Sequence, residues 1–492
     1  MDFLDPKKRR AHTIRLFVGY FLVGIALLIG TAILALAAYG FGINRKTGQV
    51  IQNGLVFIDA HPEAADIFLN GASRGKTKTR LVIPEGSYNV ELRRTGYRTW
   101  KNSFDLGGGS IVQLIYPFLF PEKLVSKDLQ TYSSLPGLST ESPDRHWLLV
   151  QSPSSLTIFQ QFDLNATKND VTSFSLPSNL LTTSTGPQAL ELVEWSTDNR
   201  HLIVRHIYPG GQEYILIDRA SPSSSQNLTK LFDRPNVQFS LHDKKYDQYY
   251  LYDLAAQNLF TGDLKSHQVT LILDKVISFK PHSADVILYV TAAATPTKVQ
   301  VKLKSGQNSY NLVQLPSANK YLIDVARFNN DWYMVAGSPS DGRTYIYKNP
   351  ADQFKSKTIT HASAFAVLKL DGPQFASFSE NTRFIEVQAG QQFAVYDLEN
   401  QKMMHYNSQL TLPANYKAVW MDGHRLILNS VSKMVVMDFD GTNQQTLVDL
   451  SSVNYLTFFD RDYKAVFTIS PSKSGASKPA LIRTELKVLP AK

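Results

Sequence analysis

A short sequence pattern recurs between residues 132 and 492 of this 492-residue chain, and it limits the possible folds more than any other feature. Each copy has an aromatic residue or a serine, then a polar turn with Asp or Asn, and then a short apolar strand. The copies begin at Ser142, Trp195, Phe239, Phe279, Phe328, Phe378, Trp420 and Phe459. Their spacing averages about 45 residues, a period that is typical of repeated units of short strands.

This repeat predicts a β-propeller over residues 132–492. A four-stranded sheet that is apolar on both faces cannot bury those faces alone, so such sheets stack radially and close a ring. The length of the region suits seven or eight blades. No segment shows a sustained period of 3.6 residues, which argues against stacked helical repeats.

A second recurring feature is an apolar strand that ends in aspartate. It occurs at Asp218, Asp397 and Asp438, and it is echoed at Asp163 and Asp253. Asp253 follows Phe239 too closely, so the third copy is predicted to be degenerate. The turns at residues 195–200 and 438–442 resemble those of TolB-like and WD-like propellers. That resemblance implies a rigid platform that binds proteins or glycans across one face.

Near the N-terminus, residues 16–43 form an uncharged apolar run. As a helix this run would be about 42 Å long, which exceeds the roughly 30 Å hydrocarbon core of a bilayer. We therefore predict a transmembrane helix at residues 16–43. A cleaved signal peptide is the alternative, with Ala35-Leu36-Ala37 as its cleavage site, although the apolar core of a typical signal peptide is shorter.

The flanking charges predict the orientation of this helix. Five Lys and Arg residues precede it within residues 1–15, whereas only Arg45 and Lys46 follow it closely. Because cationic side chains resist translocation, the basic tail is predicted to be cytoplasmic and the C-terminal domains extracellular. The first predicted partner is therefore the lipid bilayer of the cell membrane, contacted through the N-terminal helix.

The alternation of polar and apolar residues predicts a small β-sandwich at residues 51–116. The predicted strands are Leu55–Ala60, Ala65–Asn70, Ser87–Arg94, Arg98–Asp105 and Ser110–Tyr116. Glycine-containing turns separate several of them, which suits tight connections between strands. Residues 117–131 then form the predicted linker to the propeller.

The same region resembles the PEGA domain. The resemblance rests on Asn70-Gly71, Gly75-Lys76-Thr77, residues 84–90 and Gly96-Tyr97. Ala64 and Lys78 depart from the family pattern, in which glycine and proline are usual at these positions. The resemblance implies a non-catalytic surface module for interactions within the bacterial cell envelope.

The composition excludes several chemistries. The chain has no cysteine, so it has no disulfide, thiolate nucleophile, Cys zinc site or iron–sulfur cluster. It has 51 Lys and Arg residues against 42 Asp and Glu residues, a net charge of +9. Outside the first fifteen residues, however, no basic stripe with interleaved aromatic residues occurs. A nucleic-acid partner is therefore not expected.

Motifs that suggest catalytic or ligand chemistry have simpler interpretations. Residues 71–77 imitate a phosphate-binding loop, but the spacing is one residue short and no helix follows. Residues 438–441 lack the flanking helices of a calcium loop and predict a hairpin turn. His146, His201 and His424 recur beside predicted turns, where we expect local hydrogen bonds. No catalytic, metal or cofactor residue is predicted.

These features predict a non-catalytic cell-surface protein with a single-pass anchor, which binds or scaffolds a partner protein or an envelope glycan. The alternative is an exported propeller enzyme that cleaves glycans or peptides in its axial funnel. Missing motifs do not exclude that alternative, because propeller enzymes assemble sites from scattered loops. Two carboxylates about 5–10 Å apart in an axial pocket would favour a hydrolase. A mostly neutral mouth would favour binding.

Overall fold

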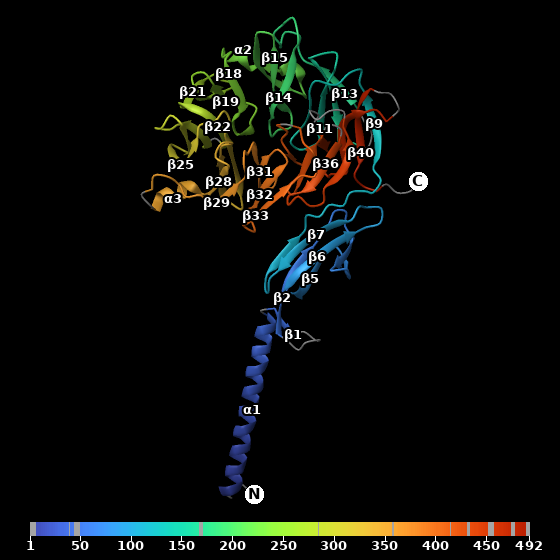
Figure 1. The fold of residues 1–492 in the computed structure, drawn as a ribbon, viewed down its shortest axis with the longest axis vertical. Helices are drawn as coiled ribbons and strands as arrows, with labels where there is room; N and C mark the ends of the chain where they lie inside the picture. The colour runs from blue at the N-terminus through green and yellow to red at the C-terminus, as the bar shows by residue number, and fades with distance from the viewer. Residues whose placement is uncertain are drawn as a thin grey trace. The chain divides into compact units, whose positions relative to one another are not determined.

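The computed structural model describes residues 6–38, 40–43, 50–166, 171–283, 285–356, 359–413, 415–430, 433–450, 457–473 and 478–488. The first five residues, together with Arg45 and Lys46, which the orientation argument uses, lie outside these ranges. The described residues form mainly β-strands, with one long helix near the N-terminus (Figure 1). The chain divides into two compact units, Met1–Lys123 and Leu124–Lys492.

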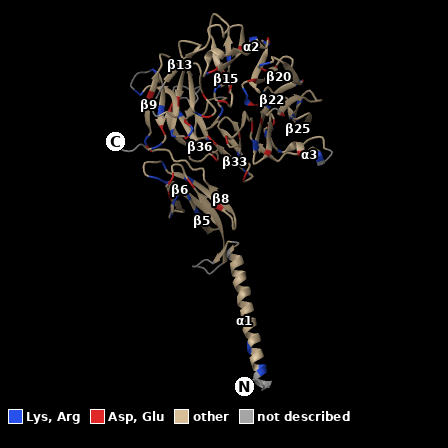
Figure 2. Cartoon of the chain, turned by 180° about the vertical axis from the view of Figure 1, so that it is seen from behind, with Lys and Arg blue, Asp and Glu red and all other residues tan. Residues whose placement is uncertain are grey.

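The first unit begins with helix α1, Pro6–Ala38. Within it, Arg9–Leu36 is long and apolar enough to cross a membrane, with a mean hydropathy of 2.4 and no burial inside the protein. Figure 2 shows the middle of this helix without charged residues and basic residues towards its N-terminal end.

The helix differs from the predicted span of residues 16–43 at both ends. It extends into the basic tail because Lys and Arg are good helix formers. It stops before Gly40, whose φ of +82° belongs to the left-handed region that commonly ends helices. Phe41–Ile43 form strand β1, which pairs with the start of β2, Val50–Ile58.

Two four-stranded sheets follow the helix and share one core. The first contains β1, β2, β5 (Thr79–Pro84) and β8 (Ile111–Leu114), and the second contains β4 (Ala72–Lys76), β3 (Asp66–Leu69), β6 (Gly86–Arg93) and β7 (Trp100–Leu106). Val56, Ile67, Val90 and Trp100 are buried between them. Each of the five predicted strands has a counterpart. Strands β1, β4 and β5 were not predicted, and β4 has no alternation to detect because all five of its residues are exposed.

The second unit contains eight four-stranded antiparallel sheets among its described residues, here called sheets 1 to 8 in chain order. Sheets 1 to 4 consist of β10 (Ser139–Glu141), β11 (Trp147–Gln151), β12 (Ile158–Asp163) and β13 (Val171–Ser175); β14 (Ala189–Trp195), β15 (His201–Tyr208), β16 (Gly211–Asp218) and β17 (Gln226–Asn227); β18 (Val237–Leu241), β19 (Gln248–Asp253), β20 (Asn258–Asp263) and β21 (Val269–Leu273); and β22 (Val276–Ser283), β23 (Val286–Ala292), β24 (Lys298–Ser305) and β25 (Asn308–Pro316).

Sheets 5 to 8 consist of β26 (Leu322–Phe328), β27 (Asp331–Gly337), β28 (Arg343–Lys348) and β29 (Ala366–Lys369); β30 (Phe375–Phe378), β31 (Phe384–Ala389), β32 (Gln392–Asp397) and β33 (Lys402–Asn407); β34 (Val419–Trp420), β35 (Arg425–Asn429), β36 (Lys433–Asp438) and β37 (Gln445–Asp449); and β38 (Phe458–Phe459), β39 (Ala465–Pro471), β40 (Pro479–Glu485) and β9 (Val125–Thr131). Short helical segments lie at α2 (Leu228–Leu231), α3 (Pro350–Ser356), Pro222–Ser224 and His242–Lys244.

Sheet 8 corrects the predicted linker at residues 117–131. Residues Val125–Thr131 form strand β9, which pairs antiparallel with β40 at the other end of the unit. A strand whose partner lies more than three hundred residues away in sequence leaves no local sign of that pairing. The linker prediction therefore fails for the second half of this range.

Each sheet packs against the next one along the chain. Core clusters join sheets 1 and 2, 2 and 3, 3 and 4, 4 and 5, and 5 and 6. The rings of Phe384 in sheet 6 and Phe439 beside sheet 7 stack 4.1 Å apart. The Ser470 hydroxyl of sheet 8 donates to the carbonyl of Asp449 in sheet 7 at 2.5 Å. A further cluster joins sheet 8 to sheet 1.

Strand β15 shows why the second strands of the sheets read as continuous apolar runs. Leu202 and Val204 pack towards sheet 1, whereas Ile203 packs towards sheet 3. Because successive side chains point to opposite faces and both faces are covered, all four residues His201–Val204 are buried. This burial replaces the polar–apolar alternation of a strand that is exposed on one side.

The recurring pattern lies at the turn between the first and second strands of each sheet. In sheet 2, Asp198 accepts hydrogen bonds from the backbone amides of Arg200 and His201 at 2.9 and 3.0 Å. Arg200 then binds the carboxylate of Asp218, which ends the third strand, at 2.7 Å. In this sheet the polar residue Asp198 orders the turn, and the strand-terminal Asp218 binds Arg200 of the same turn. The two aspartates together stabilise the packing of the first hairpin of the sheet against the second.

Candidate functional site

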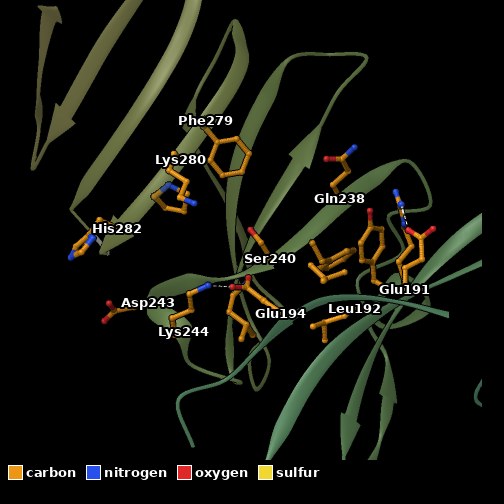
Figure 3. A pocket seen from close by; sticks show the side chains of 16 residues that line it. Glu191, Leu192, Glu194, Gln238, Ser240, Asp243, Lys244, Phe279, Lys280 and His282 are labelled. Atoms are coloured by element: carbon orange, nitrogen blue, oxygen red, sulfur yellow. Dashed lines mark hydrogen bonds and ion pairs between the residues drawn. The ribbon is translucent and has the colours of Figure 1, made fainter. Parts of the chain in front are cut away.

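A cavity of about 520 Å³ lies among sheets 2, 3 and 4, where their first strands β14, β18 and β22 supply most of its lining (Figure 3). A first strand is the edge strand of its sheet and pairs with only one other strand. The side chains of these three edge strands can therefore line one common cavity. The lining side chains discussed below are Glu191, Glu194, Arg205, Gln238, Ser240, Asp243, Lys244, Phe279, Lys280 and His282.

A β-bulge positions the two glutamates of β14. Glu191 pairs with Arg205 and Glu194 pairs with Ile203, with an irregularity between Leu192 and Glu194. In a regular strand, residues 191 and 194 would point to opposite faces. The extra residue of the bulge brings both carboxylates to the same face, because Arg205 and Ile203 share a face of β15.

Each carboxylate that lines the cavity has a cationic partner. Glu191 forms an ion pair and a hydrogen bond with Arg205. The hydrogen bond raises the pKa of the Arg205 guanidinium. Glu194 binds Lys244 and accepts the backbone amide of Leu241. These pairs balance the negative charge of β14 within the cavity.

The remaining charged groups of the lining are also paired. The Asp243 carboxylate lies 3.4 Å from the Lys245 ammonium group, and the Lys280 ammonium group lies 3.3 Å from the Asp324 carboxylate. The cavity is therefore polar and charge-balanced. Gln238, Ser240 and the Phe279 ring add uncharged contacts, which suits a ligand with hydroxyl or amide groups.

A second group of charged residues gathers around Arg145, in the turn between the first two strands of sheet 1. It contacts Glu380 from sheet 6, the Met421 carbonyl from sheet 7 and the Tyr463 ring from sheet 8. Burial raises the pKa of nearby Glu141 to about 8, and burial also raises the pKa of Glu380. Sequence spacing did not indicate this cluster, since its members come from four sheets.

The three histidines singled out in the sequence lie on three different sheets. The imidazole of His146 lies 3.2 Å from the Asp163 carboxylate in sheet 1, and that of His201 lies 2.6 Å from Asp198 in sheet 2. Burial lowers the pKa of His424, beside sheet 7, to about 4. The described residues hold no group of three or more histidines and carboxylates arranged for a metal ion.

The two loops that imitate ligand motifs lie in hairpins. Residues 71–77 belong to the β3–β4 hairpin, and the Thr77 hydroxyl accepts the buried backbone amide of Ala65 at 3.0 Å. The loop after Asp438 closes through the Gly441 amide, which donates to the Asp438 carbonyl at 2.9 Å. In both loops, these groups serve the turn itself.

A buried polar network in sheet 2 was not predicted. The ring of fully buried His206 contacts Glu213 at 2.8 Å and Gln188 at 2.9 Å. Although burial opposes it, hydrogen bonds from His206, Thr182 and Asn227 lower the pKa of Glu213 to about 2. His206 and Glu213 are directly paired across the β15–β16 hairpin. Counting back from the turn at Pro209 and Gly210 would have revealed this pair.

Comparisons with known proteins describe part of the chain. No curated protein sequence matches it. Among solved structures, dihydro-heme d1 dehydrogenase NirN in complex with DHE is 13% identical with a TM-score of 0.40, covering 65% of this chain and 67% of that one. An oligogalacturonate lyase in complex with manganese is 10% identical with a TM-score of 0.38, covering 74% of this chain and 98% of that one. The tricorn protease is 12% identical with a TM-score of 0.38, covering 75% of this chain and 38% of that one.

These structural likenesses are too weak to bear on the function of this chain. The match to a sequence family is more specific, and it falls on the two-sheet core of the first unit. Residues 53–118 match the PEGA domain family, which confirms the resemblance predicted for residues 51–116.

Proposed function

We propose that this chain is a membrane-anchored, non-catalytic binding or scaffolding protein of the cell surface. The apolar helix α1 supports the anchor, because residues 9–36 suffice to span a bilayer. Basic residues at its N-terminal end support a cytoplasmic N-terminus. The PEGA domain and the second unit would then face the outside.

We also propose that the second unit is an eight-bladed β-propeller with sheets 1 to 8 as its blades. Two observations support this proposal. Consecutive sheets contact one another, and sheet 8 packs on sheet 1. In addition, β9 from the start of the unit completes sheet 8, the arrangement by which a ring fastens its two ends.

Binding rather than catalysis is supported by one observation, the complete charge pairing of the cavity. A glycan hydrolase needs one carboxyl group that holds its proton and a second that stays ionised. In this cavity Glu191, Glu194 and Asp243 are each engaged by a cationic side chain, which leaves no unpaired carboxyl group for either role. We therefore assign the cavity to recognition of a partner protein or an envelope glycan.

The test places a photo-cross-linking residue in the cavity in living cells. We expect p-benzoylphenylalanine at Gln238 to capture one defined partner, and capture should fall when Phe279 is replaced by alanine. The same probe at Lys355, an exposed position in α3, is the matched control. Equal capture from Lys355, or a free N-terminus after Ala37 in the mature chain, would contradict the proposal.

One observation favours the alternative, a hydrolase. Glu141 and Glu380 approach Arg145, and burial raises the pKa of both carboxyl groups, as a general acid requires. If the protein were a hydrolase, purified full-length protein would cleave cell-wall glycan or peptide, and Glu141→Gln would abolish the cleavage. Under the binding proposal, neither wild type nor variant cleaves these polymers.

A further inference from the structure

The outer face of one PEGA-domain sheet carries an apolar row. Val82 of β5 and Ile111 of β8 pair with opposite sides of Leu55 in the central strand β2. Residues directly opposite in neighbouring strands point to the same face, so these three side chains form a continuous row. Val82 and Ile111 are 63% and 60% exposed.

The row extends beyond these three residues. Ile115, which follows β8 with the same alternation, is 57% exposed. The core of the domain uses the opposite face of the same strands, through Val56, Ile83 and Leu114. The apolar side chains of the outer row therefore do not contribute to the core of the domain, and their exposure to water costs free energy.

The chain path keeps this sheet near the end of the membrane span. The candidate span ends at Leu36, and β1 starts at Phe41. Five extended residues reach at most about 17 Å. The headgroup layer on each side of a bilayer is about 6 Å thick, so β1 begins in or close to it. Phe41 pairs with Gln52 of β2, only three residues before Leu55.

A basic residue lies beside the apolar row. Arg80 pairs with Phe57 in the next row of the same face. Arg80 is exposed and has no ion-pair partner among the described residues. Arginine beside exposed apolar side chains suits the interface of a membrane, where the guanidinium meets lipid phosphate and the apolar groups enter the acyl boundary.

We infer that this face, defined by Leu55, Val82, Ile111, Ile115 and Arg80, rests on the lipid bilayer and binds anionic headgroups. The inference rests on the proposed anchor, because the short connection from α1 supplies the proximity. A tethered surface experiences a high effective concentration of lipid, so modest contacts suffice for binding. The PEGA domain would then lie against the membrane by one sheet, with its second sheet turned away.

The test uses single cysteines, which are unambiguous reporters because the chain has none of its own. Full-length Val82→Cys and Ile111→Cys proteins carry the fluorophore NBD and are reconstituted in nanodiscs of phosphatidylglycerol and phosphatidylcholine with a spin-labelled lipid. Ser103→Cys, exposed on the outer face of the other sheet, is the matched control. We expect about twofold lower fluorescence at residues 82 and 111 than at residue 103, since interfacial side chains lie within reach of the quencher.

A second measurement tests the anionic headgroup. Arg80→Gln should reduce quenching at residue 111 in phosphatidylglycerol nanodiscs, whereas Arg74→Gln on the other sheet should not. Equal quenching at residues 82, 111 and 103 would overturn the inference, as would disulfide cross-linking of two copies through residue 111 without quenching. Failure of the anchor itself looks different, because the protein would then not co-elute with the nanodiscs at all.

Discussion

Arg145 forms an ion pair with Glu380, although the two residues are 235 positions apart in the chain. Arg145 lies in the turn between β10 and β11, and Glu380 lies in the corresponding turn between β30 and β31. The same guanidinium donates to the Met421 carbonyl at 2.8 Å and lies 4.6 Å from the centre of the Tyr463 ring. One side chain of sheet 1 therefore contacts sheets 6, 7 and 8.

Removing this guanidinium should destabilise the second unit. Arg145→Leu removes the guanidinium from Glu380 and the Met421 carbonyl and leaves them only the Tyr463 hydroxyl as donor, and loss of such a buried hydrogen-bonding partner costs about 1–3 kcal/mol. We expect a lower midpoint of thermal unfolding for the full-length protein. Lys464→Met, which removes an exposed ion pair with Asp462, is the control and should change the midpoint little. Equal effects of both changes would show that Arg145 has no special role.

A disulfide should join the two ends of the second unit. Ser126 of β9 pairs with Thr484 of β40, and their hydroxyl groups are 2.8 Å apart. Antiparallel pairs have Cα separations that a disulfide can bridge. Ser126→Cys combined with Thr484→Cys should oxidise readily and migrate faster on a non-reducing gel, because it closes a loop of 358 residues.

The same disulfide should raise the free energy of unfolding by up to about 5 kcal/mol, since closing a long loop restricts the unfolded chain. Reduction should return the midpoint of urea unfolding to the wild-type value. The two single-cysteine variants serve as controls. If the double variant stayed reduced under oxidising conditions, the pairing of β9 with β40 would be wrong.

Glu386 should make stability depend on pH. This carboxyl is fully buried in β31, accepts the Ser377 hydroxyl at 3.0 Å, and has its pKa raised by burial from 4.5 to about 7. Between these pKa values the folded protein binds more protons than the unfolded chain. The free energy of unfolding should therefore fall as pH rises from about 4.5 to about 7, by about 3 kcal/mol for this residue.

Glu386→Gln should remove that component, which is measured as the difference between variant and wild type in urea unfolding at several pH values. The wild type should lose more stability than the variant over the window and run parallel to it above pH 7. Asp371→Asn changes an exposed carboxylate and should leave the pH dependence intact. Parallel curves for wild type and Glu386→Gln throughout the window would contradict this prediction.

Thr77 should stabilise the PEGA domain, although its motif imitates a phosphate loop. Thr77→Val keeps the shape but leaves the buried amide of Ala65 without an acceptor, at a cost of about 1–3 kcal/mol. Hydrogen exchange at Ala65 should accelerate in this variant. Thr79→Val, two residues later in β5, is the control. Saturable binding of ATP by the wild type would instead support the phosphate interpretation.

Local patterns predicted much of the fold. All eight turns that the repeat identified lie between the first and second strands of a sheet. In sheets 1, 2, 6, 7 and 8, an Asp or Asn side chain of the turn accepts a neighbouring backbone amide. In the third copy of the repeat, the predicted strand-terminal aspartate, Asp253, proves to be on a different strand from its counterparts in the other copies. Asp253 ends the second strand β19, and the counterpart of Asp218 is Asp263 at the end of β20, which accepts the amides of Lys265 and Ser266.

Non-local relationships could not be predicted in this way. The cavity combines first strands from three sheets, and the bulge that aligns Glu191 with Glu194 depends on pairing with β15. The Arg145 cluster requires sheets 1, 6, 7 and 8 to meet. Such contacts depend on how whole sheets stack, and no spacing within one segment encodes that arrangement.

The pairing of β9 with β40 also determines when this unit can finish folding during synthesis. Sheet 8 lacks the internal strand that joins β9 to β39 until residues 479–485 have left the ribosome and, for an exported domain, crossed the membrane. Until then, the apolar flank of sheet 1 that sheet 8 later covers stays open to water and to chaperones. A chain that stops before β40 therefore leaves this apolar flank of sheet 1 uncovered.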